Sequence, residues 1–520
     1  MNFVYTIIFF LQLPVLLSAA EKTFTAAVFE PTIPRRSSMG LVSRDNAIEQ
    51  MKHVLKGYAE VAARASKKGV DILVFPENGL IAHLDGVTRL GIRNFLDLIP
   101  EPNKEKPWIP CDEPYLYPRT EIQQVISCIA KKNKIYLVVN VGDIQPCNRT
   151  DDANCPYDGR YQYNTNVVYS SEGALVSRYH KKHLFYEPYY NSPKIAEYGV
   201  FDTPFGRFAS IVCFDIYFND SLNELVMKHQ VSNILFPNLW FDTPPFFFSS
   251  LFHNSIAKAF NINLISANIK INNFVRGGSG IYTPSINRYV YNPLNPAPSD
   301  EYIQLQVKNL EKSKRTFPCP PIRKVPESDN PDVKTATMTN LFPVSAVMLH
   351  KYSGVVSVCK YNACCSLQYE FMSNRTSVFN INYILAITNE ESVDLTNPEG
   401  VDMQSCILCP IKDFKMSCLM SLPAGIPDGE VSFRKLKMTA HNFNTSYFFP
   451  HIATFNSSTY DINTSWKHDR GEIEITEPVK KVFNAVIFGR LYPNSATATF
   501  AIFPAILLIL LNLISKELLV

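Results

Sequence analysis

The chain has 520 residues, of which 46% are hydrophobic and 19% are charged, and its formal net charge is +3. This length exceeds that of one ordinary domain, and the balance of apolar and charged residues is typical of a globular protein. No block of like charge is present in the sequence, which argues against a nucleic-acid-binding surface.

Apolar runs stand at both ends of the sequence. Residues 1–20 end in the small residues Leu17-Ser-Ala-Ala20, so we predict a signal peptide for secretion. The run at residues 500–514 is shorter than the ~20 residues that a spanning helix needs. Small residues precede it, so we interpret residues 495–520 as a removable glycolipid-anchor (GPI-type) signal with attachment at Asn494. This interpretation places the protein on the extracellular side of the cell surface, and a tail-anchored helix is the alternative.

Six Asn-x-Ser/Thr triplets agree with an exported protein. A single triplet is a weak indication, but the six together match the two terminal signals. We therefore predict glycosylation at Asn148, Asn219, Asn374, Asn444, Asn456 and Asn463.

The 12 cysteines fit a protein of an oxidising compartment, where most thiols are paired. Cys111 with Cys128 and Cys147 with Cys155 are natural local pairs. Six further cysteines can form three more disulfides: Cys359, Cys364, Cys365, Cys406, Cys409 and Cys418. The Cys-x-x-Cys pair among them has no second such pair or His pair to complete a zinc site, so we interpret it as structural. Cys213 and Cys319 are left over.

Strands and helices alternate along the first half of the chain. Residues 24–29 predict a strand, and apolar residues between 45 and 68 recur at helical spacing. The apolar strand that begins at residue 71 delivers Glu77 at its C-terminal end. A helix at 121–132 and a strand at 135–141 repeat the unit, which indicates a layered α/β domain.

The next segment begins with two predicted hairpins. The first spans residues 164–179 and runs into Lys181, and the second turns at 203–206 and leads into the strand that ends at Cys213. A helix at 221–230, a strand at 233–237, a helix at 249–260 and a strand at 263–268 follow. Ile-Leu-Val-Phe-Pro at 72–76 and Ile-Leu-Phe-Pro at 234–237 look equivalent, so we expect two related halves in a two-sheet sandwich over residues 21–300.

The sequence becomes β-rich beyond residue 300. Apolar stretches at 302–307, 377–386 and 481–488 accompany the cysteine cluster and four of the sequons. We predict a second, smaller disulfide-stapled β domain over residues 301–490, without catalytic groups.

Three reactive side chains stand at predicted strand ends: Glu77, Lys181 and Cys213. Each alone has an ordinary explanation, as a loop carboxylate, a surface lysine, and a buried or disulfide-bonded cysteine. Together they suit amide hydrolysis, with a cysteine thiolate as nucleophile, a lysine that lowers its pKa and balances the oxyanion, and a glutamate that moves protons. A strand-to-helix elbow at Cys213 would favour the thiolate, and a backbone N–H near Phe214 would add an oxyanion donor.

Three motifs resemble, in order and context, those of the nitrilase superfamily of carbon–nitrogen hydrolases: Phe75-Pro-Glu77, Lys181-x-His-Leu-Phe185 and Cys213-Phe-Asp215. The chain is similar more closely to the vanin and biotinidase branch, through the runs at 162–169, 178–181, 205–208, 213–216 and 278–282. The resemblance covers residues 22 to about 285 well and the cysteines of the second domain more loosely.

The resemblance implies an α/β fold, an αββα four-layer sandwich, with Glu77, Lys181 and Cys213 as catalytic residues and no metal or organic cofactor. Vanin-type members are glycolipid-anchored pantetheinases, which cleave pantetheine to pantothenate and cysteamine, whereas the biotinidase type is soluble and acts on biotinyl amides. The C-terminal signal favours the vanin type. A surface binding protein that keeps the scaffold without catalysis is the alternative from another class.

One departure from the family concerns the substrate pocket. Where the family commonly has Pro-Thr-Ala-Trp, this chain has Pro237-Asn-Leu-Trp240, followed by Pro-Pro-Phe-Phe-Phe-Ser at 244–249, so we expect residues 238–249 to line the pocket. Glu187 is either a second carboxylate that positions Lys181 or a loop residue. We interpret His183 as a packing residue and Asp215 as a structural carboxylate.

Overall fold

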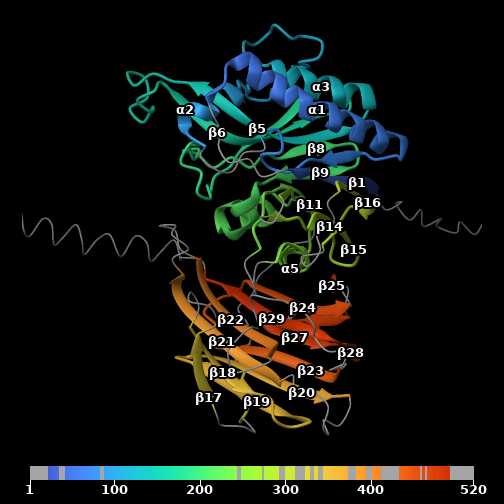
Figure 1. Cartoon of the computed structure of the whole chain (residues 1–520), viewed down its shortest axis with the longest axis vertical. Coiled ribbons are helices and arrows are strands. Elements are labelled where there is room, and N and C mark those ends of the chain that lie inside the picture. Colours follow the sequence, from blue (N-terminus) through green and yellow to red (C-terminus); the bar gives the residue numbers. More distant parts are fainter. Residues whose placement is uncertain are drawn as a thin grey trace, which may run out of the picture.

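The computed structural model describes residues 22–33, 41–81, 87–242, 248–271, 275–291, 299–310, 323–327, 333–337, 343–372, 382–393, 401–411, 432–456, 459–462 and 465–491. Two sheets form the first domain (Figure 1). The first has the order β16 (Glu301–Lys308), β1 (Thr23–Glu30), β3 (Ile72–Val74), β5 (Tyr136–Pro146), β6 (Arg160–Tyr169) and β7 (Leu175–His180), with β4 (Leu96–Asp97) on β5. The second has the order β15 (Asn287–Tyr289), β14 (Gly280–Tyr282), β11 (Asn263–Ala267), β10 (Asn233–Pro237), β9 (Gly206–Ser210) and β8 (Phe201–Thr203). A small sheet of β13 (Val275–Arg276), β12 (Lys270–Ile271) and β2 (Thr32–Ile33) lies beside them.

Helices cover the outer faces of these two sheets. Helix α1 (Arg44–Lys67), which the Ser43 side chain caps, and α3 (Glu121–Asn133) pack on the first sheet around a core that includes Leu55 and Ile126. Helix α5 (Ser249–Phe260) packs on the second sheet. Between the sheets lies an apolar cluster that includes Val74 and Leu235. The four-layer αββα arrangement is therefore confirmed (Figure 1).

The two halves of the sandwich repeat one pattern. Strand β3 lies between the parallel neighbours β1 and β5, and β10 lies between the parallel neighbours β9 and β11. Parallel neighbours on both sides leave no strand edge exposed, which explains why these two segments are continuous apolar runs. The equivalence of the two Ile-Leu segments is thus confirmed.

The boundary between the domains differs from the sequence prediction. Strand β16, expected at the start of the second domain, pairs antiparallel with β1 along all eight residues, from Thr23 opposite Lys308 to Glu30 opposite Glu301. The β-rich texture of residues 301–308 therefore belongs to the first sheet, and the second domain begins beyond it.

The second domain is a sandwich of two further sheets. One has the order β17 (Val333–Thr337), β18 (Pro343–Met348), β21 (Asn382–Val393), β22 (Val401–Ile411), β29 (Val482–Arg490), β24 (Phe448–Asn456) and β25 (Thr459–Asp461). The other has the order β19 (Ser353–Lys360), β20 (Ala363–Phe371), β23 (Ser432–His441), β27 (Glu472–Ile475) and β26 (Trp466–His468), with β28 (Val479–Lys480) on β23. The Cys365–Cys406 disulfide joins β20 to β22 and thus links the two sheets.

The two domains share a continuous core. Strand β24 packs on α5, where the ring of Phe252 lies 6.1 Å from that of Phe449 and 6.2 Å from that of Phe488. The second domain therefore adds two sheets beneath the helical layer of the first (Figure 1).

Both predicted local disulfides, Cys111–Cys128 and Cys147–Cys155, are present. Cys359 pairs with Cys364, and Cys409 is also disulfide-bonded, whereas Cys319 and Cys418 lie outside the described residues.

The termini are only partly within the described residues. The signal segment, Asn494 and the C-terminal apolar run lie outside them, as do the side chains of four of the sequon asparagines. The other two, Asn148 and Asn444, are exposed. No helix in the described part of the chain is long and apolar enough to cross a membrane.

Candidate active site

Four strand ends meet at one edge of the two central sheets. Glu77 follows β3 and Lys181 follows β7 in the first sheet, while Cys213 follows β9 and Leu239 follows β10 in the second. The structure brings the three predicted site residues together. Glu77 and Lys181 are close enough to shift the pKa of Cys213, and Glu77 and Cys213 are close enough to shift that of Lys181. All three are buried.

Lys181 lies between two carboxylates. Its Nζ donates to Glu77 Oε1 at 2.8 Å and to Glu187 Oε2 at 2.5 Å, and all three side chains are buried. Glu187 is therefore more than a loop residue, since it is a direct partner of the lysine. A buried ammonium requires such partners because an isolated charge would be strongly destabilised by loss of water.

A chain of asparagine amides fixes the carboxylates. Asn164 Nδ2 donates to Glu77 Oε1 and to Glu187 Oε1, each at 2.8 Å. Asn140 Nδ2 in turn donates to Asn164 Oδ1 at 2.7 Å, and its own Oδ1 accepts the Asn78 N–H at 2.8 Å. Because each amide is oriented by the next, neither carboxylate can rotate without breaking hydrogen bonds.

Leu239 links the two sheets at the site. Its N–H donates to Glu77 Oε2 at 2.9 Å, and its carbonyl oxygen lies 3.6 Å from Cys213 Sγ, which donates to it. The general acid–base candidate and the candidate nucleophile therefore contact the same residue.

Cys213 begins a tight turn. Its φ is +44°, a conformation that non-glycine residues adopt at a cost of about 1–3 kcal/mol and that is concentrated at functional sites. The turn that follows is a five-residue 3-10 helix, η2 (Cys213–Tyr217), then a π-helical turn, η3 (Asn219–Asn223), and only then a short α4 (Glu224–Met227). The predicted helix over 221–230 is present in part, since residues 219–227 are helical, first as the π turn and then as α4. This helix does not begin at Cys213 and therefore contributes little dipole there.

The protonation of the site also differs from the prediction. Burial raises the pKa of the Cys213 thiol well above its ordinary value, and the nearby Glu77 carboxylate raises it further, while Lys181 acts in the opposite direction. Burial therefore favours the neutral thiol of Cys213 over the thiolate, and Glu77 and Glu187 add to this effect while Lys181 opposes it. Among the described cysteines it is the only free thiol.

The two charged partners have shifted pKa values for related reasons. Burial raises the pKa of Glu77 above its usual range, and Lys181 only partly opposes this effect. Burial alone would lower the pKa of Lys181, but the carboxylates of Glu187 and Glu77 raise it well above its ordinary value. The lysine is thus a fixed cation, and Glu77 is a stronger base than an ordinary carboxylate.

Asp215 and His183 lie beside the site in the roles predicted for them. Asp215 accepts the N–H groups of Val212 at 3.1 Å and His183 at 2.8 Å and the Tyr179 hydroxyl at 2.9 Å, so it ties the start of η2 to the segment after Lys181. Burial raises its pKa to about 6. The His183 ring stacks on Phe218 with 3.6 Å between centroids.

In the expected pocket segment, the described residues Asn238 and Trp240 pack into the protein frame. Asn238 is fully buried and donates to Ser266 Oγ at 2.9 Å, so it is part of the frame. Trp240 packs in a cluster of three rings with Tyr217 and Phe252, at 5.4 and 5.6 Å between centroids. Residues 243–247 lie outside the described residues.

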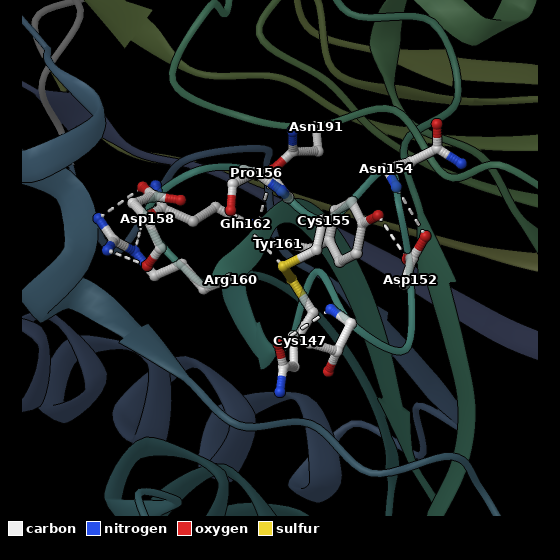
Figure 2. Close-up of a disulfide and its surroundings, with 12 residues drawn as sticks. Cys147, Asp152, Asn154, Cys155, Pro156, Asp158, Arg160, Tyr161, Gln162 and Asn191 are labelled. Carbon is white, nitrogen blue, oxygen red and sulfur yellow. Dashed lines mark hydrogen bonds and ion pairs between the residues drawn. A yellow bond between two sulfur atoms is a disulfide. The ribbon is translucent and has the colours of Figure 1, made fainter.

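Two sets of contacts hold the chain that follows Glu187, and one of them comes from the loop that the Cys147–Cys155 disulfide closes (Figure 2). The Asn191 side chain accepts the Gln162 N–H at 2.9 Å and an Arg89 N–H at 3.0 Å, and Arg89 also pairs with Asp158 at 2.8 Å. Asp152, inside the loop closed by Cys147 and Cys155, forms an ion pair with Lys194 at 2.5 Å. The loop therefore contacts the segment that follows Glu187 in the sequence.

Sequence reasoning missed the asparagine chain and the Leu239 backbone. Asn140 and Asn164 are polar residues at buried positions in otherwise apolar strands, and such residues require hydrogen-bond partners. That pattern was a usable signal for the asparagines. A backbone contact such as that of Leu239 leaves no trace in residue type. No group of three or more His, Cys, Asp or Glu side chains suited to a metal ion occurs among the described residues.

Comparisons with known proteins match both domains. The family model "Carbon-nitrogen hydrolase" matches residues 41–237, and the model "Vanin C-terminal domain" matches residues 332–495. The pantetheinase of Sus scrofa is 31% identical over 93% of this chain and 92% of its own length, and the biotinidase of Bos taurus is 31% identical over 90% and 92%. A solved amidase from Nesterenkonia sp. is 15% identical with a TM-score of 0.37, covering 56% of this chain and 91% of its own.

Proposed function

Because the chain belongs to the vanin and biotinidase family of carbon–nitrogen hydrolases, and is therefore an amide hydrolase, we propose that it hydrolyses pantetheine to pantothenate and cysteamine outside the cell. The observation that carries the proposed chemistry is the buried contact of Lys181 with Glu77, 2.8 Å long, beside the free Cys213 thiol. This cluster contains a nucleophile, a base and a cation, which amide hydrolysis requires.

In the acylation half, the Cys213 thiol attacks the amide carbonyl while Glu77 takes its proton. A neutral thiol needs such a base, and the raised pKa of Glu77 suits the transfer. The tetrahedral intermediate then collapses, the C–N bond breaks, and Glu77 gives its proton to the departing amine. The product of this half is a thioester on Cys213 and a free amine.

In the deacylation half, Glu77 takes a proton from water as the water oxygen attacks the thioester carbonyl. The C–S bond breaks, the proton returns to the thiol, and the carboxylic acid leaves. Glu77 thus begins and ends the cycle as a carboxylate. Its two oxygens stay oriented by the Asn164 amide and the Leu239 N–H throughout.

Lys181 is proposed to stabilise the oxyanion of both tetrahedral intermediates. Of its three N–H groups, two donate to Glu77 and Glu187 in the described part of the chain, so the third can donate to a substrate oxygen. Glu187 has a positioning role, because it holds the ammonium in place from the other side. A preorganised donor of this kind typically contributes about 10²–10³ in kcat.

The choice of pantetheine rests on the apolar C-terminal run, which is typical of the anchored vanin type. Biotinyl amide hydrolysis is the second candidate, because the bovine biotinidase is as similar to the chain as the porcine pantetheinase, each at 31%. Both reactions use the same mechanism and differ only in the acyl group that the pocket accepts.

The test is turnover of pantetheine and of biocytin, side by side, by the purified protein. We expect release of cysteamine from pantetheine and its loss in the Cys213→Ala variant. Faster turnover of biocytin would replace pantetheine by a biotinyl amide as the substrate. Wild-type cysteamine release by Cys213→Ala would refute the mechanism. No turnover of either amide, together with no labelling of Cys213 by a thiol-reactive analogue, would favour the alternative that the chain is a surface binding protein without catalytic activity.

For localisation, we propose a lipid anchor at Asn494. Phosphatidylinositol-specific phospholipase C applied to intact cells should release the active protein into the medium. A protein that stays with the membranes after this treatment is held by a spanning helix instead.

A further inference from the structure

The second domain reaches the turn that carries the candidate nucleophile. Arg490, the last residue of β29, is buried, and its Nε donates to the carbonyl oxygen of Tyr217 at 3.3 Å. Tyr217 is the last residue of the η2 turn that begins at Cys213. One guanidinium of the second domain therefore contacts the end of the catalytic turn.

The backbone of Arg490 is itself firmly held. Its N–H donates to the Tyr447 carbonyl at 3.1 Å, its carbonyl accepts the Thr445 hydroxyl at 2.5 Å, and it lies opposite Met403 in the pairing of β22 with β29. A side chain that projects from so well-fixed a strand end offers a rigid point of attachment. The η2 turn is only five residues long, and Asp215 holds its start, so its C-terminal end is where a contact from outside adds support.

A second polar contact joins the same regions. The Asn223 amide, in the η3 turn that follows η2, donates to the Tyr447 hydroxyl at 3.1 Å. Tyr447 and Arg490 thus contact two successive turns after Cys213 from neighbouring positions of the second domain.

Aromatic packing supports these polar contacts. The Tyr217 ring stacks on Phe252 at 5.1 Å and on Trp240 at 5.4 Å, and Phe252 packs against Phe488 of the second domain. Trp240 follows Leu239, which contacts both Glu77 and Cys213. The face of the second domain that packs on α5 therefore lies behind both segments of the site that come from the second sheet.

The conformation of Cys213 explains why such support is needed. A positive φ at a cysteine is disfavoured and persists only where the surrounding structure determines it. The Tyr217 carbonyl lies at the C-terminal end of η2, where carbonyl groups lack intrahelical partners and need a donor from elsewhere. An arginine in this place stabilises the turn and, through it, the direction of the Cys213 side chain.

We propose that Arg490 is a positioning residue for the amidase reaction, and that the second domain serves the reaction by fixing the turn that carries Cys213. This inference rests on the proposed function, since it assigns Cys213 as the acylated residue. Arg490 acts through the Tyr217 carbonyl and is not itself placed in contact with substrate.

The test compares four proteins: wild type, Arg490→Ala, Arg490→Lys and Tyr289→Phe. The last is a matched control, because the Tyr289 hydroxyl accepts an interdomain hydrogen bond from Ile462 N–H at 3.2 Å but belongs to β15, at the other end of the second sheet from β9. We expect Arg490→Ala to lower kcat by up to about 10²-fold with little change in KM, because a displaced nucleophile slows the chemical step. Arg490→Lys, which keeps a cationic donor, should recover part of the loss, and Tyr289→Phe should keep the wild-type kcat.

Hydrogen exchange of residues 213–223 gives a reading that does not depend on turnover. Arg490→Ala should exchange faster there than wild type and Tyr289→Phe. If wild type hydrolyses no amide, the proposed function fails, and the exchange measurement still tests whether Arg490 fixes the turn. If Arg490→Ala has the wild-type kcat and exchange, or if it lowers only the melting temperature, the proposal is wrong.

Tyr447→Phe keeps the proposal testable if Arg490→Ala does not fold. It removes only the hydroxyl that accepts from Asn223. A smaller fall in kcat in the same direction, with faster exchange over residues 213–223, supports the proposal, and wild-type values for both contradict it.

Discussion

Glu77 has two tasks that its surroundings make compatible. As a carboxylate it accepts hydrogen bonds from Lys181, Asn164 and Leu239, and as a base it must take a proton from a neutral thiol. Burial raises its pKa, which makes protonation easier without removing the partners that orient it. The cluster therefore combines a fixed geometry with a movable proton.

The first prediction concerns Glu77→Gln. The amide keeps the shape of the side chain but cannot take the thiol proton, so both halves of the reaction lose their base. We expect kcat to fall by about 10²–10⁴-fold. The control is Glu172→Gln, which removes an exposed carboxylate that pairs with Lys134 and should leave kcat unchanged. A fall of less than about tenfold in Glu77→Gln would remove Glu77 from the role of base.

The second prediction is the pH dependence of kcat/KM. The base must be ionised to act, so activity is lost as the pH falls through the Glu77 pKa. Burial raises that pKa, and the acid limb should therefore lie above pH 4.5, the ordinary value for a glutamate. The limb belongs to the coupled cluster rather than to one group. A profile that stays flat to below pH 4.5 would show that no buried carboxylate controls the reaction.

At the scale of elements, local pattern predicted most of the sandwich. The apolar spacing in α1 and the continuous apolar runs of β3 and β10 are determined by which face of each element is buried, and these patterns were recognised. Strand β16 was assigned to the wrong domain because its partner, β1, lies at the other end of the first domain in sequence. Such a long-range pairing has no local signal.

The site was predictable in part for the same reason. Glu77, Lys181 and Cys213 follow strands, so reactive residue types at strand ends marked them. A helix was expected directly after Cys213, and the 3-10 turn found there was missed because a five-residue turn is too short to show a period. The contact of Arg490 with Tyr217 joins two domains through a backbone carbonyl, and residue type does not reveal such a contact.

The third prediction concerns the Cys147–Cys155 disulfide. Its removal in Cys147→Ser/Cys155→Ser should lower the unfolding free energy by about 2–3 kcal/mol, because a short loop is no longer closed. It should also lower kcat, because Asp152 in this loop pairs with Lys194 in the segment that follows Glu187. Denaturant unfolding and turnover measure the two effects.

The matched control is Cys359→Ser/Cys364→Ser. This pair also closes a short loop: its sequence separation is 5, and that of Cys147–Cys155 is 8. It lies in the second domain, in the hairpin formed by β19 and β20. We expect a comparable loss of stability with the wild-type kcat. Equal effects of both double variants on kcat would mean that the disulfides act only through global stability.

At the scale of the whole molecule, one apolar cluster crosses the boundary between the two domains. The apolar cluster around α5 contains residues from η2, from the second sheet and from strands β18, β22, β24 and β29 of the second domain. Interfaces between domains that move relative to each other are more polar than this cluster. The second domain is therefore built onto the amidase domain as part of one folded unit, which agrees with the positioning role proposed for Arg490.

The last prediction follows from this shared core. Phe449 in β24 is buried against Phe252 and Phe260 of α5, with ring distances of 6.1 and 5.9 Å. Phe449→Ala should lower the unfolding free energy by about 3–5 kcal/mol, because it leaves a cavity between the domains. Hydrogen exchange should show lost protection in both α5 and β24, although the substitution lies in only one domain.

The control for this variant is Phe433→Ala, in the core between the two sheets of the second domain. It should destabilise the protein by a similar amount, because Phe433 is equally buried, but α5 should lose less protection than in Phe449→Ala. If the domains unfold separately, Phe449→Ala will expose β24 while α5 keeps its protection. That result would mean that the second domain can detach while the turn that carries Cys213 stays in place. The contact of Arg490 with Tyr217 would then not be needed to hold that turn.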